Sequence, residues 1–484
     1  MSGFVLALLP LLGAALAYAL PLNRLRPLVL PAVATAHLLL TLYAVQGRPV
    51  LPGDQWFMLD PAGKIVLLTI SILFFCCALY APGYLRHHAT RSNRMLCTCL
   101  LWMLSMMTVV THAQHLGLMW VAMEATALSS APLIYFRHTP EAIEATWKYL
   151  LLSSIGVALA LLGSFFLAYA AMVGGGMTSL LFSDLVQGAP DLSKPWLHAA
   201  FVTLLVGYGT KMGLAPMHTW KPDAYGEAPG VIGALLAGGL TSCAFLAIAR
   251  FTMVLSAAGD AALAHRLLIG LGLLSMGTAA AFLARQRDFK RMLAYSSVEH
   301  MGILAIGMGI GGLGVFGALL HLINNALTKG VLFLAAANIH RTYGSKSVDE
   351  VRGAFQRAPL SAAFFLMGFI AIAGSPPFGP FVSLFSILQA AFERHYFLTG
   401  AALLIMLWAI FIGMGWTVLR VVQGAPVARP PQTGDLPQSS TRERKSLVVP
   451  VAVLACLVLL MGIWIPAPLG NLLREAAAYL EVQP

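Results

Sequence analysis

The sequence predicts an all-α polytopic membrane protein, and three observations support this fold class. Hydrophobic residues occupy 59% of the 484 positions and charged residues only 10%, whereas about a quarter of the residues in a soluble domain are charged. Apolar runs long enough to cross a bilayer recur from one end of the chain to the other. We expect about 14 transmembrane helices, centred near residues 12, 36, 73, 103, 126, 160, 207, 242, 274, 302, 326, 376, 411 and 459.

The first apolar stretch is predicted to be a retained helix. It lacks a preceding basic segment, and "LAYALPLNRLRP" is a poor cleavage site. Most of the 30 lysine and arginine residues lie in the loops after odd-numbered spans. The positive-inside rule therefore predicts that these loops are cytoplasmic and that both termini lie outside. The net charge of +11 mainly reflects these basic residues in the loops on one side of the membrane. They form no basic face suited to a nucleic acid.

Two of the expected spans are interrupted by proline near their middles. The seventh contains Pro216 in "YGTKMGLAPMHTW", and the twelfth contains Pro376, Pro377 and Pro380 in "AIAGSPPFGPFVSLF". These spans are five apart, so a repeat of five helices must be inverted in the membrane. Paired broken helices in inverted repeats indicate a transport site, because unwound backbone needs polar partners or water. Kinks that serve packing alone are the alternative.

The repeat divides the chain into five parts. Residues 1–93 hold the first three helices, 94–257 the first five-helix repeat (spans 4–8), and 258–422 the second, inverted repeat (spans 9–13). Residues 423–446 are rich in proline, serine and charge, and we expect a flexible cytoplasmic linker there. Residues 447–484 hold the last span and a tail that extends it or lies at the interface.

Ionisable residues occur inside several expected spans, where a charge costs roughly 3 kcal/mol on insertion scales. They are Glu124 in the fifth span, Lys148 at the start of the sixth, Lys211 in the seventh, Glu299 and His300 in the tenth, and His321 and Lys329 in the eleventh. His321, Asn325 and Lys329 recur at intervals of four and so share one helical face, which we call the polar stripe.

Buried acids and bases on successive helices can form a proton wire, because burial disfavours their charged forms and lets each group take up and release a proton. Static ion pairs, such as Glu124 with Lys148 or Lys211, would explain the pairs alone equally well. They would not explain the polar stripe and the two broken helices. His112 and His115 fall in a short expected loop, and we predict that both are solvated.

The six cysteines all fall in apolar spans without a second ligand pair, so we interpret them as small packing residues. The sequence shows no phosphate loop, dinucleotide fingerprint or convincing haem ligand pair, and His87 and His88 are expected to be surface histidines. We therefore expect neither a metal nor a cofactor in this chain, and no redox chemistry of its own.

Several motifs resemble the antiporter-like subunits of respiratory complex I and its relatives. The resemblance covers about residues 60–390 and includes "YAPGYLRHH", "GLMWVAMEATALSSAPLIYF", "TKMGLAPMHTWKPDAYGEAP", "RDFKRMLAYSSVEHMGI", "HLINNALTKGVLFLAAANI" and "AGSPPFGPF". The forms "MEAT", "EATWKYLL" and "GLAPMHTW" are most similar to the F-type membrane subunit of hydrogenase-4 and of formate-hydrogenlyase-related complexes. Such subunits are membrane partners of group 4 [NiFe]-hydrogenases.

The resemblance implies a proton-translocating subunit in the inner membrane of a prokaryotic cell. The NiFe centre and the iron–sulfur clusters would lie in partner subunits, some membrane-embedded and some hydrophilic. Glu124 would pair with the pumping lysine, Lys211, and Lys148 would be the sixth-helix lysine. Lys329 would be the central lysine that passes protons onward, and His300 and His321 match positions of polar or histidine links.

The sequence also departs from the family pattern. Ala237 and Ser242 stand in the eighth span, where many relatives carry lysine or histidine, and Asn325 replaces a frequent histidine. Leu384 stands where relatives usually place the glutamate or lysine that ends the line of titratable groups through the membrane. Leucine cannot carry a proton. In such proteins each five-helix repeat holds half of the proton channel. Water or another group such as Glu393 must therefore bridge this gap, or the half-channel of the second repeat is inactive. The extra Lys221, in the expected loop after the seventh span, adds a charge to which we assign no role.

These departures leave two alternative functions open. One is a structural subunit that anchors a redox arm and no longer pumps. The other is a subunit of a cation/proton antiporter or of an inorganic-carbon uptake system, built on the same fold with a different partner. The identity of the partner would distinguish them, and the sequence of this chain does not contain it.

Overall fold

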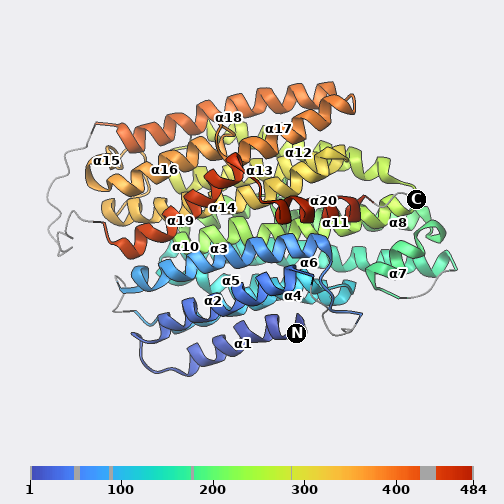
Figure 1. Cartoon of the computed structure of the whole chain (residues 1–484), viewed down its shortest axis with the longest axis horizontal. Helices are drawn as coiled ribbons and strands as arrows, with labels where there is room; N and C mark the ends of the chain where they lie inside the picture. The colour runs from blue at the N-terminus through green and yellow to red at the C-terminus, as the bar shows by residue number, and fades with distance from the viewer. Residues whose placement is uncertain are drawn as a thin grey trace.

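The computed structural model describes residues 3–47, 55–86, 91–175, 179–284, 286–425 and 443–481. Within these ranges the chain is almost entirely helical, and its strand-like features are three isolated bridges. The long helices run side by side along one direction (Figure 1). The all-α prediction is confirmed. Most of the expected linker at 423–446 lies outside the described residues, as do His87 and His88.

The first half of the chain forms helices α1 to α11. Their bounds are α1 Gly3–Ala19, α2 Arg26–Val45, α3 Pro61–Leu85, α4 Arg94–His112, α5 Leu116–Ile134, α6 Pro140–Val173, α7 Phe182–Gln187, α8 Lys194–Met212, α9 Trp220–Glu227, α10 Gly230–Leu235 and α11 Thr241–Ala257. A π-helical segment, Leu236–Leu240, joins α10 to α11 without a break.

The second half forms helices α12 to α20. Their bounds are α12 Ala261–Leu283, α13 Phe289–Ile310, α14 Leu313–Tyr343, α15 Ala354–Arg357, α16 Pro359–Ile372, α17 Gly379–Glu393, α18 Phe397–Gln423, α19 Lys445–Ile463 and α20 Ala467–Leu480. Helix starts follow local chemistry. The Asp288 carboxylate accepts hydrogen bonds from the first backbone amides of α13, and Thr139 caps α6 in the same way.

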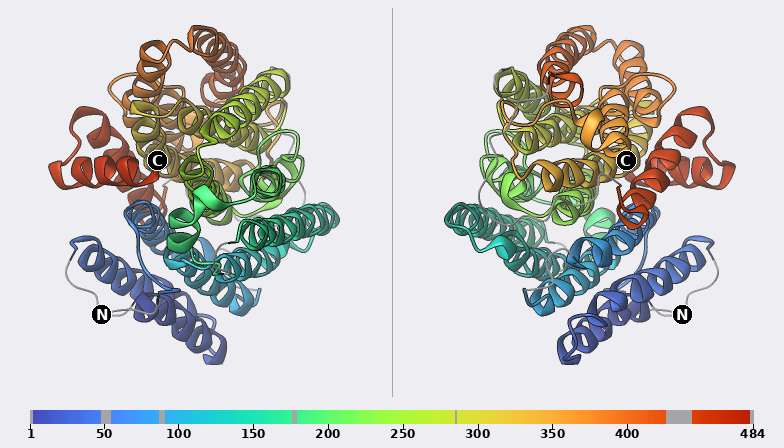
Figure 2. Two further views of the ribbon diagram at one scale, coloured as in Figure 1. Left: turned by 90° about the vertical axis from the view of Figure 1, so that its right-hand side faces the viewer. Right: turned by 90° about the vertical axis from the view of Figure 1, so that its left-hand side faces the viewer.

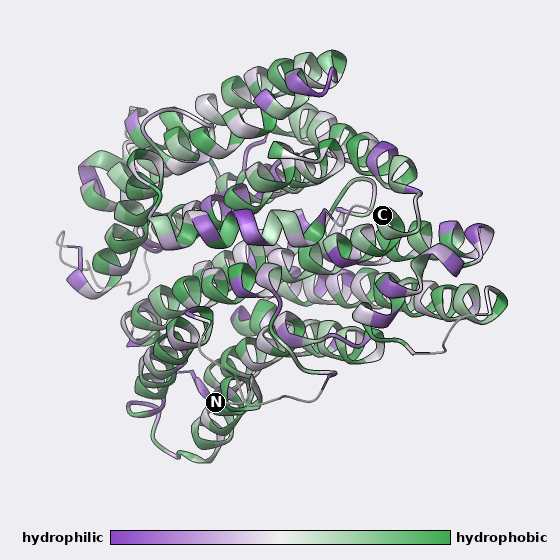
Figure 3. Cartoon of the chain, turned by 45° about the vertical axis from the view of Figure 1, so that its right-hand side comes forward, coloured by the Kyte–Doolittle hydropathy of each residue, from purple (hydrophilic) through white to green (hydrophobic). Residues whose placement is uncertain are grey.

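Among the described residues, eleven helices are long and apolar enough to cross a membrane, and α1 and α16 are shorter apolar helices. Hydrophobic residues predominate along the bundle (Figure 3). The α10–α11 segment and α14 are buried along their whole apolar stretches, whereas only 28% of the apolar stretch of α18 is buried. An end-on view shows the helices gathered around this interior (Figure 2). Helix α14, which carries the polar stripe, therefore lies in the core.

Both proline-containing segments leave the helical conformation. Helix α8 ends at Met212, Gly213 follows with φ +77°, and α9 begins only at Trp220. Helix α16 ends at Ile372, and α17 begins at Gly379 after Pro376 and Pro377. A positive φ favours glycine because it has no Cβ. In the first break, which contains Pro216, the Ala215 amide donates to Ser275 Oγ at 2.9 Å.

A buried arginine joins three helices. Arg250 on α11 bonds Asp60 at the start of α3, with 2.8 Å between Nη2 and Oδ2. Its guanidinium also donates to the backbone oxygens of Thr111 and Ala113, both at 2.9 Å, at the end of α4. The buried charge is thereby matched by acceptors on two other helices.

His112 and His115 differ from the prediction of two solvated side chains. His112 is the last residue of α4 and is buried, so the prediction is wrong for it. Its ring stacks on Phe57, with 4.8 Å between centroids, because the segment before α3 folds over it. His115 is half-buried and caps α5, where its Nδ1 accepts from the Gly117 amide at 3.1 Å.

The tail forms a separate helix, α20, rather than a simple extension of α19. One face of α20 packs against α3, α11 and α14, and Leu473 and Ala476 on that face are fully buried. Beyond its end, the Glu481 carboxylate accepts a hydrogen bond from the backbone amide of Gly312. The tail is thus part of the bundle.

Candidate functional site

The first predicted pair of charges comes together between α5 and α8. Lys211 is fully buried on the last turn of α8, and its Nζ lies 3.8 Å from Glu124 Oε2 on α5. The Ser154 hydroxyl on α6 donates to the other carboxylate oxygen at 3.3 Å. The separation of lysine and glutamate is longer than a hydrogen bond but within reach of a strong electrostatic interaction.

Lys148 does not join this pair. Its Nζ lies 2.6 Å from Glu144, one turn earlier on α6, and 3.0 Å from Asp223 on α9. The side chain is half exposed, so the ion pairs are of the solvent-screened kind. Of the two partners that the sequence suggested for Glu124, the structure selects Lys211.

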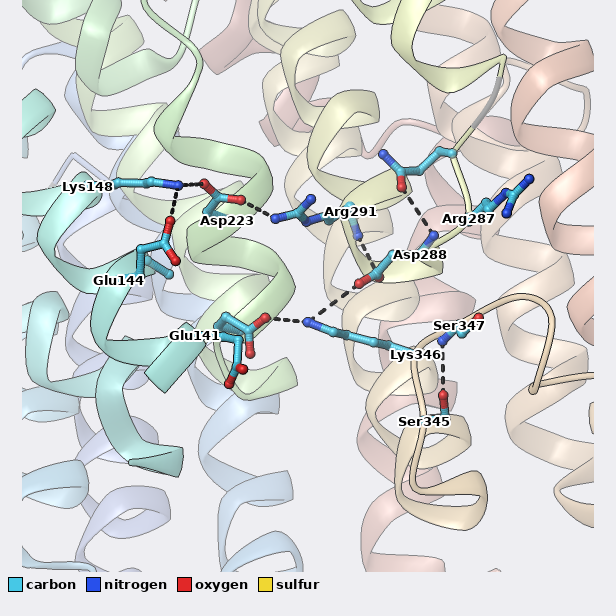
Figure 4. Close-up of a pocket in the computed structure, with 13 residues that line it drawn as sticks. Glu141, Glu144, Lys148, Asp223, Arg287, Asp288, Arg291, Ser345, Lys346 and Ser347 are labelled. Atoms are coloured by element: carbon cyan, nitrogen blue, oxygen red, sulfur yellow. Dashed lines mark hydrogen bonds and ion pairs between the residues drawn. The ribbon is translucent and has the colours of Figure 1, made fainter. Parts of the chain in front are cut away.

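Lys148 instead lines a charged pocket of about 570 Å³ between α6, α9, the start of α13 and the loop after α14 (Figure 4). Two short chains of ion pairs cross it. Asp223 joins Lys148 to Arg291, and Lys346 joins Glu227 on α9 to Asp288. No local pattern predicts this pocket, because its charges come from segments far apart along the chain.

The second group of charges lies between α13 and α14. Lys329 is fully buried, and its Nζ donates to Ser296 Oγ at 2.9 Å and to Leu293 O at 3.4 Å. The Ser296 hydroxyl also lies 3.4 Å from Glu299 Oε2. A serine thus stands between a buried base and a buried acid. Serines are common in membrane helices, so the sequence alone does not single out Ser296.

Two predicted histidines lie beside Glu299 and are hydrogen-bonded to each other, which forms a relay toward α17. His300 Nε2 lies 3.7 Å from Glu299 Oε2, and His300 Nδ1 lies 3.0 Å from His321 Nε2. The other ring nitrogen of His321 lies 2.9 Å from Ser383 Oγ on α17. All of these side chains are buried. The relay therefore ends one residue before Leu384, at a serine that the motifs do not point to.

Glu393 does not bridge the gap at Leu384. It is exposed at the end of α17 and accepts a hydrogen bond from Gln389 at 2.8 Å. Ten residues of helix, about 15 Å at the usual helical rise, separate it from Ser383. The suggestion that Glu393 completes the line is wrong, because α17 carries it away to the rim of the bundle.

Two asparagines add polar atoms beside the second break. Asn324 and Asn325 are buried on α14, and their side-chain oxygens have no hydrogen-bond partner among the described residues. A Cβ placed on Gly379 would lie only 2.3 Å from Asn324 Oδ1, so this amide presses against the start of α17. Buried polar atoms that lack a protein partner are normally satisfied by water.

No group of three or more histidine, cysteine, aspartate or glutamate side chains that could hold a metal ion occurs in the described ranges. Five of the cysteines are buried, and Cys456 is exposed.

A helical membrane bundle with buried acids and bases beside two broken helices has the architecture of an antiporter-like membrane subunit. A family model described as "NADH:quinone oxidoreductase/Mrp antiporter, TM" matches residues 113–412. The chain belongs to this family.

Individual relatives agree with this membership. The chain is 32% identical over 439 residues to a hydrogenase-4 component F homolog of Methylacidiphilum infernorum (isolate V4), covering 89% of this chain and 90% of that protein. It is 28% identical over 448 residues to NADH-quinone oxidoreductase subunit N of Desulforudis audaxviator (strain MP104C), covering 90% and 87%. The predicted resemblance is confirmed.

A solved structure shares the fold. A chain of the membrane-bound sulfane sulfur reductase (MBS), an archaeal respiratory membrane complex, superposes with a TM-score of 0.87 at 23% identity, over 99% of this chain and 97% of that one. At this identity the likeness shows the fold alone.

Proposed function

We propose that this chain is a proton-translocating membrane subunit of a hydrogenase-4 or complex I-like oxidoreductase. One observation carries the proposal, namely two groups of ionisable and hydroxyl side chains inside the bundle, one between α5 and α8 and the other between α13, α14 and α17; together they make up the proposed line. Its members are Glu124, Lys211, Lys329, Ser296, Glu299, His300, His321 and Ser383. Static ion pairs would require only the first two.

The first pair supplies a switch. Lys211 is buried, and Glu124 is its only carboxylate partner among the described residues. Protonating Glu124, or moving it away, removes the interaction that stabilises the lysine's positive charge. In a medium of low dielectric constant that change is large, so Lys211 releases its proton.

The second group supplies a route. A serine hydroxyl donates one hydrogen bond and accepts others, so Ser296 can pass a proton between Lys329 and Glu299. Each histidine ring can take a proton on one nitrogen and release it from the other. The contact between His321 and Ser383 supports a route that reaches α17 despite Leu384.

The two breaks support a topology of about 14 crossings. In this proposal α8 with α9, and α16 with α17, each make one broken crossing, at equivalent places in inverted repeats over 94–257 and 258–422. The charged pocket then opens to the cytoplasm, because the loops that line it are the basic odd-numbered ones. Both termini lie on the opposite side of a prokaryotic inner membrane.

The surface around Glu124 supports a membrane partner. The Glu124 side chain keeps 23% of its area exposed, between outward-facing apolar residues such as Val121, Leu128 and Leu151. A carboxylate facing lipid is costly. We propose that another subunit covers this face, and that hydrophilic partners hold the NiFe centre and iron–sulfur clusters, as the resemblance to hydrogenase-4 subunits implies.

One specific observation favours a second candidate, a structural anchor that no longer pumps. The eighth crossing holds Ala237 and Ser242, both buried, and Leu384 ends the line without an ionisable group. A chain with these residues can keep its fold and its partners after losing proton transfer between its halves.

The test uses the native assembly, purified through a tag on this chain and placed in liposomes. Mass spectrometry should identify a nickel–iron hydrogenase large subunit with iron–sulfur partners. Adding the electron donor and acceptor should acidify the liposome interior. Redox partners without proton movement would favour the anchor, and the absence of redox partners would contradict the proposal.

A further inference from the structure

The proposed line is interrupted between its two halves. Lys211 belongs to the first half and Lys329 to the second, and no hydrogen bond or ion pair joins them within the described chain. The crossing that lies between them, α10 with α11, has Ala237 and Ser242 at the expected positions. The Ser242 hydroxyl is engaged with the Gly238 carbonyl at 2.6 Å.

Lys221 on α9 lies at this interruption. It is fully buried, and its aliphatic chain runs against the first break. A Cβ placed on Gly213, two residues after Lys211, would lie 2.1 Å from Lys221 Cε and 2.7 Å from its Nζ. The amine is thus held against the turn that follows Lys211, with the ring of Tyr225 5.9 Å away.

The Lys221 amine is not part of a static ion pair. Its Nζ has no hydrogen-bond partner among the described residues. Lys290 makes an informative contrast, because it is equally buried and donates to the backbone oxygens of Gly226 at 2.8 Å and Ala228 at 2.7 Å. Lys290 thus has two backbone acceptors, whereas the described residues offer the Lys221 amine none.

Lys221 also lies toward the second half of the line. The ring of Tyr225, one turn further along α9, packs on the ring of Phe333 on α14, with 5.6 Å between centroids. Phe333 is one turn after Lys329, so the same stretch of α9 that carries Lys221 contacts the helix that carries Lys329.

We infer that Lys221 is the proton carrier between the halves, in place of the lysine or histidine that the eighth crossing lacks. This inference rests on the proposed function. In the transfer, the Lys221 amine gains the proton that the Lys211 ammonium loses, and then passes it toward Lys329. One N–H bond breaks as another forms, so atoms and charge balance. Asp223, two residues further on α9, faces the charged pocket and is not part of this step.

The deciding experiment measures redox-driven proton uptake per electron in liposomes that contain the whole assembly. Lys221→Met keeps the length and bulk of the side chain but cannot carry a proton. It should lower uptake at least about tenfold, with normal assembly. Lys221→Gln, which is also uncharged, should behave alike. Uptake that survives in either assembled variant overturns the inference.

Lys221→His separates proton carriage from a structural role. Imidazole carries a proton, so uptake should be partly restored. Because an unperturbed imidazole loses its proton near pH 6.5 and a lysine only near pH 10.4, the alkaline limit of uptake should move to lower pH. An assembled histidine variant that is inactive, or that has the wild-type pH profile, overturns the inference.

Two parallel variants keep the outcomes distinct. Lys290→Met should reduce assembly while leaving uptake per assembled complex unchanged, because it removes donors from two buried carbonyls. Lys211→Met tests the proposed function itself. If it abolishes uptake and Lys221→Met does not, only the present inference fails. If neither variant lowers uptake, the proposed function fails as well.

Discussion

Lys329 and Glu299 do not form a direct ion pair, because Ser296 lies between them. The serine hydroxyl accepts from the lysine at 2.9 Å and lies 3.4 Å from the carboxylate. A direct ion pair would bind the proton strongly to the lysine. A hydroxyl between the two groups can hydrogen-bond to both, so a proton can pass between acid and base without such a pair forming.

Ser296→Ala should therefore slow proton uptake about tenfold or more while leaving assembly intact. Ser297→Ala is the matched control, since Ser297 is the next residue on α13, equally buried, and bonds only the Leu293 carbonyl within its own helix. Uptake in liposomes should fall in the first variant only. Equal loss in both would show that the effect arises from helix packing.

The His321–Ser383 contact gives a second prediction at this scale. Ser383→Ala removes the hydroxyl 2.9 Å from His321 Nδ1 and should reduce uptake, because the relay then ends at the histidine. The control is Ser386→Ala, one turn further along α17, where the hydroxyl bonds the Val382 carbonyl. Unchanged uptake in Ser383→Ala would mean that protons do not pass through α17.

Among the elements, the break between α8 and α9 has the strictest local requirement. Gly213 combines φ +77° with close contact to the Lys221 side chain. Any larger residue meets both a backbone penalty and a steric clash. The break therefore depends on one glycine and on the lysine that packs on it.

Gly213→Ala should destabilise the protein by about 1–2 kcal/mol from the backbone alone, and more from the clash. Gly270→Ala, in α12, is the control. A Cβ there meets no atom within 4 Å and the residue is helical, so the substitution should be neutral or slightly stabilising. Thermal unfolding in detergent compares the two. A Gly213→Ala variant as stable as wild type would contradict the described packing.

Much of this arrangement is accessible from the sequence, because apolar runs and internal prolines act locally. The spacing of His321, Asn325 and Lys329 places them on one helical face, and the family motifs indicate the pairing of Glu124 with Lys211. The roles of Ser296 and Ser383 are not accessible, since they depend on how two helices rotate against each other. For the same reason, the sequence pattern wrongly predicts that His112 lies in a solvated loop. In the structure, the ring of Phe57 covers it.

At the scale of the whole molecule, two wholly buried segments, α10–α11 and α14, form the core around which the others pack. Arg250 fixes this core to the start of α3 and to the end of α4. Its partner Asp60 lies 190 residues away in the sequence. No local pattern could have predicted this bond, yet it joins the N-terminal helices to the first repeat that we propose.

Arg250→Met should destabilise the protein by about 3–5 kcal/mol, because it leaves the Asp60 carboxylate buried without its partner. Arg287→Met, in the charged pocket, should change stability by less than about 0.5 kcal/mol. The midpoint of thermal unfolding of the purified assembly reports both. A small effect of Arg250→Met would show that water reaches Asp60.

The central claim is that the buried line moves protons, and Lys211→Ala tests it most directly. The measurement is redox-driven proton uptake by membrane vesicles, together with the amount of assembled complex and its redox turnover. We predict that uptake is abolished while assembly is unchanged, because Lys211 is the buried base that exchanges its proton with the line. Wild-type uptake in this variant would contradict the account. Loss of assembly would assign Lys211 a structural role.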